Sequence, residues 1–304
     1  ASDQAHIQFY TYTSTRTRID VAMETAVTNF INTVATENVG KEQSDQHRIA
    51  IVDYAGDVDQ YSTGRGPNQT YFTYCTQGAN ANALIGYVED FTYNGGTEAD
   101  LGFDRAQDII NGDPGYGSGA RDEAKKVVIF FTDGMPGDGD YVENDNAGSS
   151  VNTAYQMKQA GTAIYSVGVF EGADPGDLTG QGSTTHDANY FMNAVSSNYP
   201  DAQSERTGNN RVDFSDNCTL GERAEGNYYF AASDAEALND VFQSIYDDFS
   251  SGAVSPIENT TTIGGDQVGY LTFGDTLGNY MEVKNLKTIV FAGEEFHYSG
   301  TQPS

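Results

Sequence analysis

The residues best placed to do chemistry lie where an apolar run ends on an acid. Residues 125–140 read KKVVIFFTDGMPGDGD, in which five apolar residues lead to Asp133. An aspartate there can bind a metal ion, act as a catalytic acid, or begin an Asp-Gly turn. Asp138 and Asp140 follow in the same loop, where solvated acids are ordinary. A hydroxyl side chain, Thr97, follows a glycine pair in NGGTEAD and has the residue type of a helix N-cap.

Carboxylate and hydroxyl oxygens are the ligands of hard divalent cations such as Mg²⁺, Mn²⁺ and Ca²⁺. A hydrolase reading of Asp133 fails, because an aspartate-nucleophile phosphatase needs a second aspartate two residues later, where Met135 stands. We therefore predict no catalytic residue and no enzyme activity. The four histidines show no ligand spacing, and we interpret them as surface residues: His6, His47, His186 and His297.

Apolar periodicity predicts the elements that position these side chains. Helices are expected over residues 18–39, 84–91, 97–110, 151–160 and 235–249. Strands are expected over residues 49–52, 127–132, 163–170 and 228–231, with 71–75 as an edge strand or a surface excursion. The glycine-rich run 115–119 precedes a strand, so we interpret it as a turn and not as a nucleotide loop.

Strands that alternate with helices predict an α/β fold with a doubly wound, mostly parallel sheet and helices on both faces. Ligands of such folds bind at the carboxyl ends of the strands, which is where Asp133 stands. After Gly252 the helical pattern ends and short apolar runs such as TIVF (288–291) indicate strands. We predict two domains, the α/β domain at 1–252 and a β-strand module at 253–304.

Charge and composition exclude several classes of function. The chain has 44 acidic and 15 basic residues and a net charge of −29, which disfavours nucleic acid as a partner. No apolar run reaches the roughly 18 to 20 residues of a membrane span. Cys75 and Cys218 lack metal-site spacing, and both a disulfide and two free thiols stay open.

Several segments resemble the von Willebrand factor type A domain. They are the helix TRIDVAMETAVTNFI, the strands HRIAIVDYAGD, VVIFFTDGMP and AIYSVGVFEGADP, and the loop NGGTEADLGFDRAQDII. The segments NYFMNAVSSNYPDA and NYYFAASDAEALNDVF resemble the version found in surface adhesins and pilus-tip proteins of Gram-positive bacteria. The tail GYLTFGDTLGNYMEVKNLKTIVFAGEEF resembles the β module that follows the domain in those proteins.

This resemblance implies a metal-ion-dependent adhesion site built from three loops. Thr97 matches its threonine and Asp133 matches its last aspartate, so both are predicted metal ligands for a divalent cation, Mg²⁺ before Mn²⁺ or Ca²⁺. The first motif, D-x-S-x-S, has no match. Its nearest register is Thr11-x-Thr13-x-Thr15. Either the sequence begins after the motif and residues 1–17 lead into the first helix, or the motif has diverged.

The implied function is a cell-surface, extracellular adhesion module that binds a host or matrix protein through the cation. The residues that contact that ligand are not identified by the sequence. The alternative is a structural or assembly part of a surface fibre, in contact with neighbouring subunits and with a vestigial metal site. The unmatched first motif and the trailing β module favour this alternative.

Overall fold

The computed structural model describes residues 19–54, 69–91, 96–133, 135–137, 142–180, 184–205, 214–232, 234–251, 257–263, 266–272, 288–291 and 294–297. The chain divides into two compact units, residues 1–249 and 250–304. Each unit is considered by itself. The interpretation of the two parts as an α/β domain and a β module of an adjoining domain stays a prediction.

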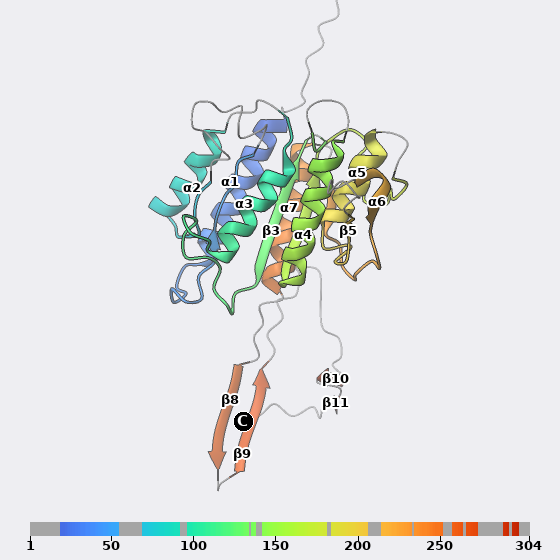
Figure 1. The fold of residues 1–304 in the computed structure, drawn as a ribbon. Helices are drawn as coiled ribbons and strands as arrows, with labels where there is room; N and C mark the ends of the chain where they lie inside the picture. Colours follow the sequence, from blue (N-terminus) through green and yellow to red (C-terminus); the bar gives the residue numbers. More distant parts are fainter. Residues whose placement is uncertain are drawn as a thin grey trace, which may run out of the picture. The chain divides into compact units, whose positions relative to one another are not determined.

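The first unit alternates strands and helices along the chain (Figure 1). Its helices are α1 (Ile19–Glu37), α2 (Ala79–Glu89), α3 (Ala99–Asn111), α4 (Asn144–Gln159), α5 (Thr184–Val195), α6 (Phe214–Asn217) and α7 (Ala235–Ser251). Its strands are β1 (Arg48–Ile49), β2 (Thr73–Tyr74), β3 (Lys126–Thr132), β4 (Thr162–Gly168), β5 (Gln203–Ser204), β6 (Cys218–Thr219) and β7 (Tyr229–Ala231).

A parallel sheet in the order β3-β4-β7 forms the centre of this unit. The register pairs Lys126 with Thr162 and Thr132 with Gly168, so β3 and β4 end together. Because side chains alternate along a strand, β3 feeds two cores. Val127, Ile129 and Phe131 pack on the α1 and α7 side, and Val128 and Phe130 pack on the α3, α4 and α5 side.

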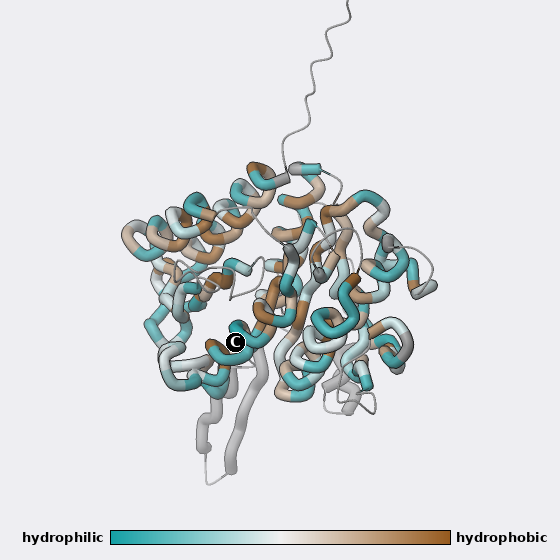
Figure 2. The backbone as a smooth tube through the Cα atoms, turned by 45° about the horizontal axis from the view of Figure 1, so that its top comes forward, coloured by the Kyte–Doolittle hydropathy of each residue, from teal (hydrophilic) through white to brown (hydrophobic). Residues whose placement is uncertain are grey.

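The helices therefore cover both faces of the sheet, as the sequence predicted. In Figure 1, α3 and α4 lie in front of β3, while α1 and α7 lie behind it. Figure 2 shows hydrophobic and hydrophilic residues alternating along the helices, the pattern of helices with one buried side. The predicted fold class, an α/β fold with a parallel sheet between helices, is confirmed.

Some element boundaries differ from the sequence predictions. α2 begins at Ala79 instead of residue 84, and α4 begins at Asn144 instead of near residue 151. Of the strand expected over 49–52, only Ile49 lies in β1, which pairs antiparallel with β2. Within the described residues β3 pairs only with β4. Residues 1–17, where the first motif was sought, lie outside the described residues.

The two cysteines are free thiols on opposite faces of the sheet. Cys75 is buried in the core that contains α1 and α7, and Cys218 packs beside the core of α4 and α5. Burial raises the pKa of Cys75 to about 11 and that of Cys218 to about 12. Both thiols are thus protonated near neutral pH and unreactive.

The second unit contains two antiparallel hairpins. One pairs β8 (Ile257–Ile263) with β9 (Asp266–Thr272), and the other pairs β10 (Thr288–Phe291) with β11 (Glu294–His297). In the part of the chain that is described, no helix has the length and apolar content needed to cross a membrane.

Candidate metal site at the carboxyl end of the sheet

Asp133 stands directly after β3, at the carboxyl end of the parallel sheet. The residue before it, Thr132, is buried, and its carbonyl accepts a hydrogen bond of 3.0 Å from the Val169 N–H. The backbone up to Thr132 is therefore held between its neighbours, while Asp133 itself is exposed. A strand that ends in this way presents the carboxylate to solvent from a rigid base.

Thr97 is held against the loop that Asp133 begins. Its N–H donates to the Gly137 carbonyl, and the Gly137 N–H donates back to the Thr97 carbonyl, each at 2.9 Å. Gly137 has φ 140°, a conformation that favours glycine, which explains the residue type at that position. The structure thus joins the two loops that carry the predicted ligands, although they are far apart in sequence.

The prediction that Thr97 is the N-cap of the following helix is wrong. The N-cap of α3 is Glu98, and its side chain makes no capping hydrogen bond. The backbone of Thr97 is drawn into the two-hydrogen-bond bridge with Gly137, so the residue lies one position before the cap. Its side chain is half-buried.

The cap interaction comes from α4 instead. Asn146 is 4% exposed, and its Oδ1 accepts a hydrogen bond of 3.3 Å from the Asp100 N–H at the start of α3. Its Nδ2 donates to the Thr97 carbonyl at 3.1 Å and to a Glu98 carboxylate oxygen at 2.8 Å. One buried amide therefore fixes both sides of the Thr97 loop. The sequence analysis missed Asn146, because its role depends entirely on tertiary contacts.

Tyr54 joins the segment after β1 to the end of β3. Its hydroxyl donates to the Phe131 carbonyl at 2.9 Å, and its ring stacks on Phe130 with centroids 5.8 Å apart. A Cβ at Gly102 on α3 would lie 3.0 Å from the Tyr54 ring, so glycine there makes room for the ring. This close packing anchors Tyr54 in one position.

Two carboxylates act on the Tyr54 hydroxyl. Burial raises the pKa of Tyr54 well above its usual value, and the nearby charges of Asp133 and Asp53 raise it further. Burial also raises the pKa of Asp53. Asp53 follows the apolar run IAIV as Asp133 follows VVIFF, so the same sequence pattern marks both acids. The sequence analysis did not single out Asp53.

The donor types at this end of the sheet, a hydroxyl and carboxylates, fit a hard divalent cation. Within the described ranges, however, no three His, Cys, Asp or Glu side chains are grouped so that they could hold a metal ion. The structure brings together the loops of Thr97 and Asp133. Asp138, Asp140 and the Thr11-x-Thr13-x-Thr15 register lie outside the described residues.

The loop after β4 lies beside this end of the sheet and is tied to α5. Asn189 is fully buried and donates to the Gly172 carbonyl at 2.9 Å, while its Oδ1 accepts from the Asp174 N–H at 2.9 Å. His186 Nδ1 lies 2.5 Å from an Asp177 carboxylate oxygen. His186 was predicted to be an ordinary surface residue. It is 43% exposed, and it holds this loop through an acid.

Comparison with known proteins gives one family and several similar structures. A family model of the von Willebrand factor type A domain matches residues 12–205, which is more than half of the chain. Two crystal structures of the pilus adhesin SpaC from Lactobacillus rhamnosus GG are similar, with TM-scores of 0.52 and 0.51 at 15% and 14% sequence identity. Each match covers 77% of this chain and 28% of that chain.

Proximal thread matrix protein 1 from the mussel byssus matches with a TM-score of 0.43 and 15% identity, over 75% of this chain and 41% of that chain. A comparison with curated protein sequences found no match. This chain spans less than half of the length of the SpaC and mussel byssus structures that it matches.

Proposed function

Because the chain belongs to the von Willebrand factor type A domain family, we propose that it is an adhesion module. It binds a protein ligand at the carboxyl end of its sheet through a divalent cation, Mg²⁺ before Mn²⁺ or Ca²⁺. Thr97 and Asp133 are the proposed metal ligands on this chain. The proposal is one of binding and includes no catalytic step.

The pairing of Thr97 with Gly137 carries this proposal. Two hydrogen bonds of 2.9 Å hold the Thr97 loop to the loop that begins at Asp133. Asn146 fixes the Thr97 side of the pair, and Tyr54 anchors the end of β3. A hydroxyl and a carboxylate from separate loops are thus supported by contacts that do not involve either side chain, as a preorganised site requires.

Thr97 and Asp133 would hold the cation, which would act as a Lewis acid toward an acidic side chain of the ligand. The residues of this chain then act only by position: Thr97 and Asp133 provide oxygen atoms, and Asn146 and Tyr54 keep the two loops in register.

The proposed partners are a host or matrix protein, and the proposed location is the cell surface. Support comes from the similar fold of a bacterial pilus adhesin, which is a likeness in fold at 15% identity. The activity of that longer protein is carried to this chain only as part of the proposal.

The test is calorimetric titration of Mg²⁺, followed by binding to immobilised fibrinogen, fibronectin and collagen with and without EDTA. We expect stoichiometric Mg²⁺ binding that Asp133→Ala abolishes and Thr97→Ala weakens at least tenfold, a loss of about 1.4 kcal/mol. Ligand binding should fall in parallel. Asp122→Asn is the matched control, since it removes one exposed acid near the opposite end of β3.

The outcome that contradicts the proposal is equally clear. If Asp133→Ala binds Mg²⁺ as tightly as wild type, the predicted ligand set is wrong. If ligand binding is also unchanged by Asp133→Ala and by EDTA, the adhesion site lies elsewhere on the chain. Loss of binding in Asp122→Asn as well would indicate a general charge effect instead of a site.

A structural role in a surface fibre is the second candidate. The hairpins β8–β9 and β10–β11 favour it, because the outer edge of a two-stranded hairpin can pair with a strand of a neighbouring subunit. Under this alternative the intact protein binds no Mg²⁺ stoichiometrically, and assembly is insensitive to EDTA. Tight stoichiometric Mg²⁺ in the calorimetric titration counts against it.

A further inference from the structure

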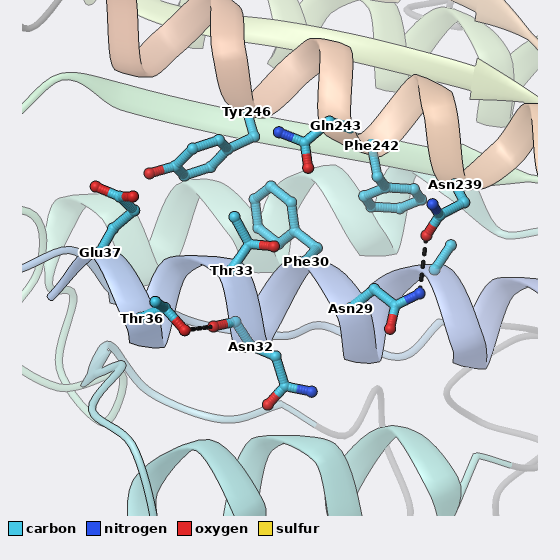
Figure 3. Close-up of a pocket in the computed structure, with 11 residues that line it drawn as sticks. Asn29, Phe30, Asn32, Thr33, Thr36, Glu37, Asn239, Phe242, Gln243 and Tyr246 are labelled. Carbon is cyan, nitrogen blue, oxygen red and sulfur yellow. Dashed lines mark hydrogen bonds between the residues drawn. The ribbon is translucent and has the colours of Figure 1, made fainter. Parts of the chain in front are cut away.

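A groove of about 420 Å³ runs between α1 and α7, on the flank of the sheet (Figure 3). Its lining residues are distant in sequence from Thr97 and Asp133. Its volume falls within the range of about 300–1,000 Å³ that is usual for small-molecule sites. The side chains that matter most for recognition come from both helices: Asn29, Phe30 and Thr33 from α1, and Asn239, Gln243 and Tyr246 from α7.

Aromatic rings form the floor of the groove. Phe30 is half-buried and stands among Phe242, Tyr246 and Phe249, with ring centroids 5.7, 6.3 and 6.1 Å away and all three pairs edge-on. Figure 3 shows the Phe30 ring between the two helices, below Gln243. This arrangement provides an apolar surface between polar walls, against which the C–H face of a ligand can pack.

Amide groups span one end of the groove. Asn29 Nδ2 donates to Asn239 Oδ1 at 2.9 Å, across the two helices (Figure 3). A side-chain amide has two donor hydrogens and an acceptor oxygen with two lone pairs. This single bond therefore leaves the pair with further donors and acceptors side by side. These donors and acceptors can bond to neighbouring hydroxyl groups of a ligand, because each hydroxyl both donates and accepts.

Two hydroxyls of the groove have no protein partner among the described residues. Thr25 and Thr36 on α1 donate to the carbonyl four residues earlier, each at 2.8 Å, whereas Thr33 makes no such bond. The Tyr246 hydroxyl is also unpaired and points toward Glu37 in Figure 3. Burial, with the charges of Glu37 and Asp247, raises the pKa of Tyr246 to about 12, so this hydroxyl stays a donor.

Charge and wall chemistry narrow the class of ligand. The described residues that line the groove include one carboxylate, Glu37, and no Lys, Arg or His. Together with a net charge of −29, this disfavours phosphate, sulfate or carboxylate groups. An amphipathic peptide helix fits poorly, because its apolar face would cover Asn29, Asn239 and Thr33 and leave their polar atoms unpaired.

We propose that the groove between α1 and α7 binds a neutral oligosaccharide. The Asn29–Asn239 pair and the Thr33 and Tyr246 hydroxyls bond its hydroxyl groups, while Phe30 packs against an apolar sugar face. This site is separate from the proposed cation site and needs no metal.

The test is saturation-transfer NMR on the full chain with neutral tetrasaccharides of glucose, mannose and N-acetylglucosamine. A heparin tetrasaccharide serves as the anionic comparator. We expect at least one neutral probe to bind with a Kd of about 1 mM or tighter, and the heparin probe to bind more weakly than that one. Asn239→Leu should raise this Kd at least tenfold, and Thr33→Val several-fold. Thr25→Val is the matched control on α1 and should leave the Kd unchanged.

Circular dichroism and the unfolding midpoint establish that each variant is folded before the Kd values are compared. EDTA and Asp133→Ala should leave sugar binding unchanged, which separates this proposal from the cation site. The proposal is overturned if no neutral probe binds, if the heparin probe binds as tightly as the best neutral one, or if Asn239→Leu and Thr33→Val behave like Thr25→Val. Loss of sugar binding on EDTA treatment overturns it as well, because the sugar would then occupy the cation site.

Discussion

Lys158 is a buried lysine whose charge lies beneath the end of α5. Its Nζ donates to the carbonyls of Ala194, Ser196 and Tyr199 at 2.7, 3.2 and 2.8 Å. These are carbonyls at and just beyond a helix end, which carry no intrahelical partner. Lys158→Met keeps the apolar stem but leaves the carbonyls unpaired, so we expect a loss of about 2 kcal/mol in the free energy of unfolding.

Urea unfolding at pH 7 measures this change, with Lys125→Met as the control. Lys125 is exposed, and its substitution should change the free energy of unfolding by less than about 0.5 kcal/mol. An equal effect of the two substitutions would mean that the three carbonyls find water when the ammonium group is removed.

The same residue predicts a pH dependence. Burial lowers the pKa of Lys158 to about 7, far below the roughly 10.4 of an unfolded lysine. Between these values the unfolded chain binds more protons than the folded one, so this residue makes the free energy of unfolding rise with pH. The gap between wild type and Lys158→Met should widen from pH 7 to pH 9 in urea unfolding. A gap that stays constant would mean that the carbonyls keep the ammonium charged in the folded protein over this pH range.

Asp133 and Thr97 were predicted as metal ligands from their residue types, their element context and the resemblance to the family, and this assignment stays a prediction. An acid after an apolar run and a threonine after a glycine pair both carry a local pattern. Asn146 and Tyr54 carry none, because each acts through hydrogen bonds to segments more than forty residues away in sequence. Their roles follow from the fold and not from any neighbouring residues.

At the scale of elements, α5 and the loop over residues 171–180 behave as one unit. The hydrogen bond from His186, followed by those from Thr179 and Asn189, holds the pKa of Asp177 below its usual range. Asp177→Asn weakens these bonds, and we expect about 1 kcal/mol less stability at pH 7. Amide hydrogens of residues 174–179 should exchange faster in the variant, as measured by mass spectrometry.

The sign of the pH effect distinguishes this explanation from a general loss of packing. A carboxylate whose pKa is lowered by folding stabilises the protein above its unfolded pKa of about 3.9, and this contribution is lost as pH falls below that value. The difference between wild type and Asp177→Asn should therefore shrink on acidification below about pH 4. Asp122→Asn, the exposed control, should show no such convergence.

The apolar stripes of α1, α3 and α7 predicted those helices well, whereas a helix held by buried polar groups was missed. No helix was predicted over α5, because the sequence from Glu171 to about Gly226 is largely polar, apart from the apolar runs at 190–192 and 194–195. Two positions of α5 hold fully buried asparagines, Asn189 and Asn193. Their amides bond to backbone carbonyls of the loop before α5, which offsets the cost of burial. Periodicity methods count such residues as solvent-facing, and so they hide the helix.

At the scale of the whole molecule, the net charge of −29 opposes the compact state through repulsion between like charges. Added salt shortens the Debye length from about 30 Å at 0.01 M to about 8 Å at 0.15 M and screens this repulsion. We expect the free energy of unfolding to increase over that range of NaCl.

Chemical denaturation by urea in the presence of EDTA measures this effect without a contribution from bound divalent cations. Sucrose at matched osmolality is the control for effects that do not depend on charge. MgCl₂ at the same ionic strength, without EDTA, should stabilise the protein more than NaCl does, and the excess should disappear in Asp133→Ala. An equal response to both salts would mean that Mg²⁺ acts only by screening. A fall in stability with NaCl would mean that attraction between opposite charges outweighs repulsion in the folded chain.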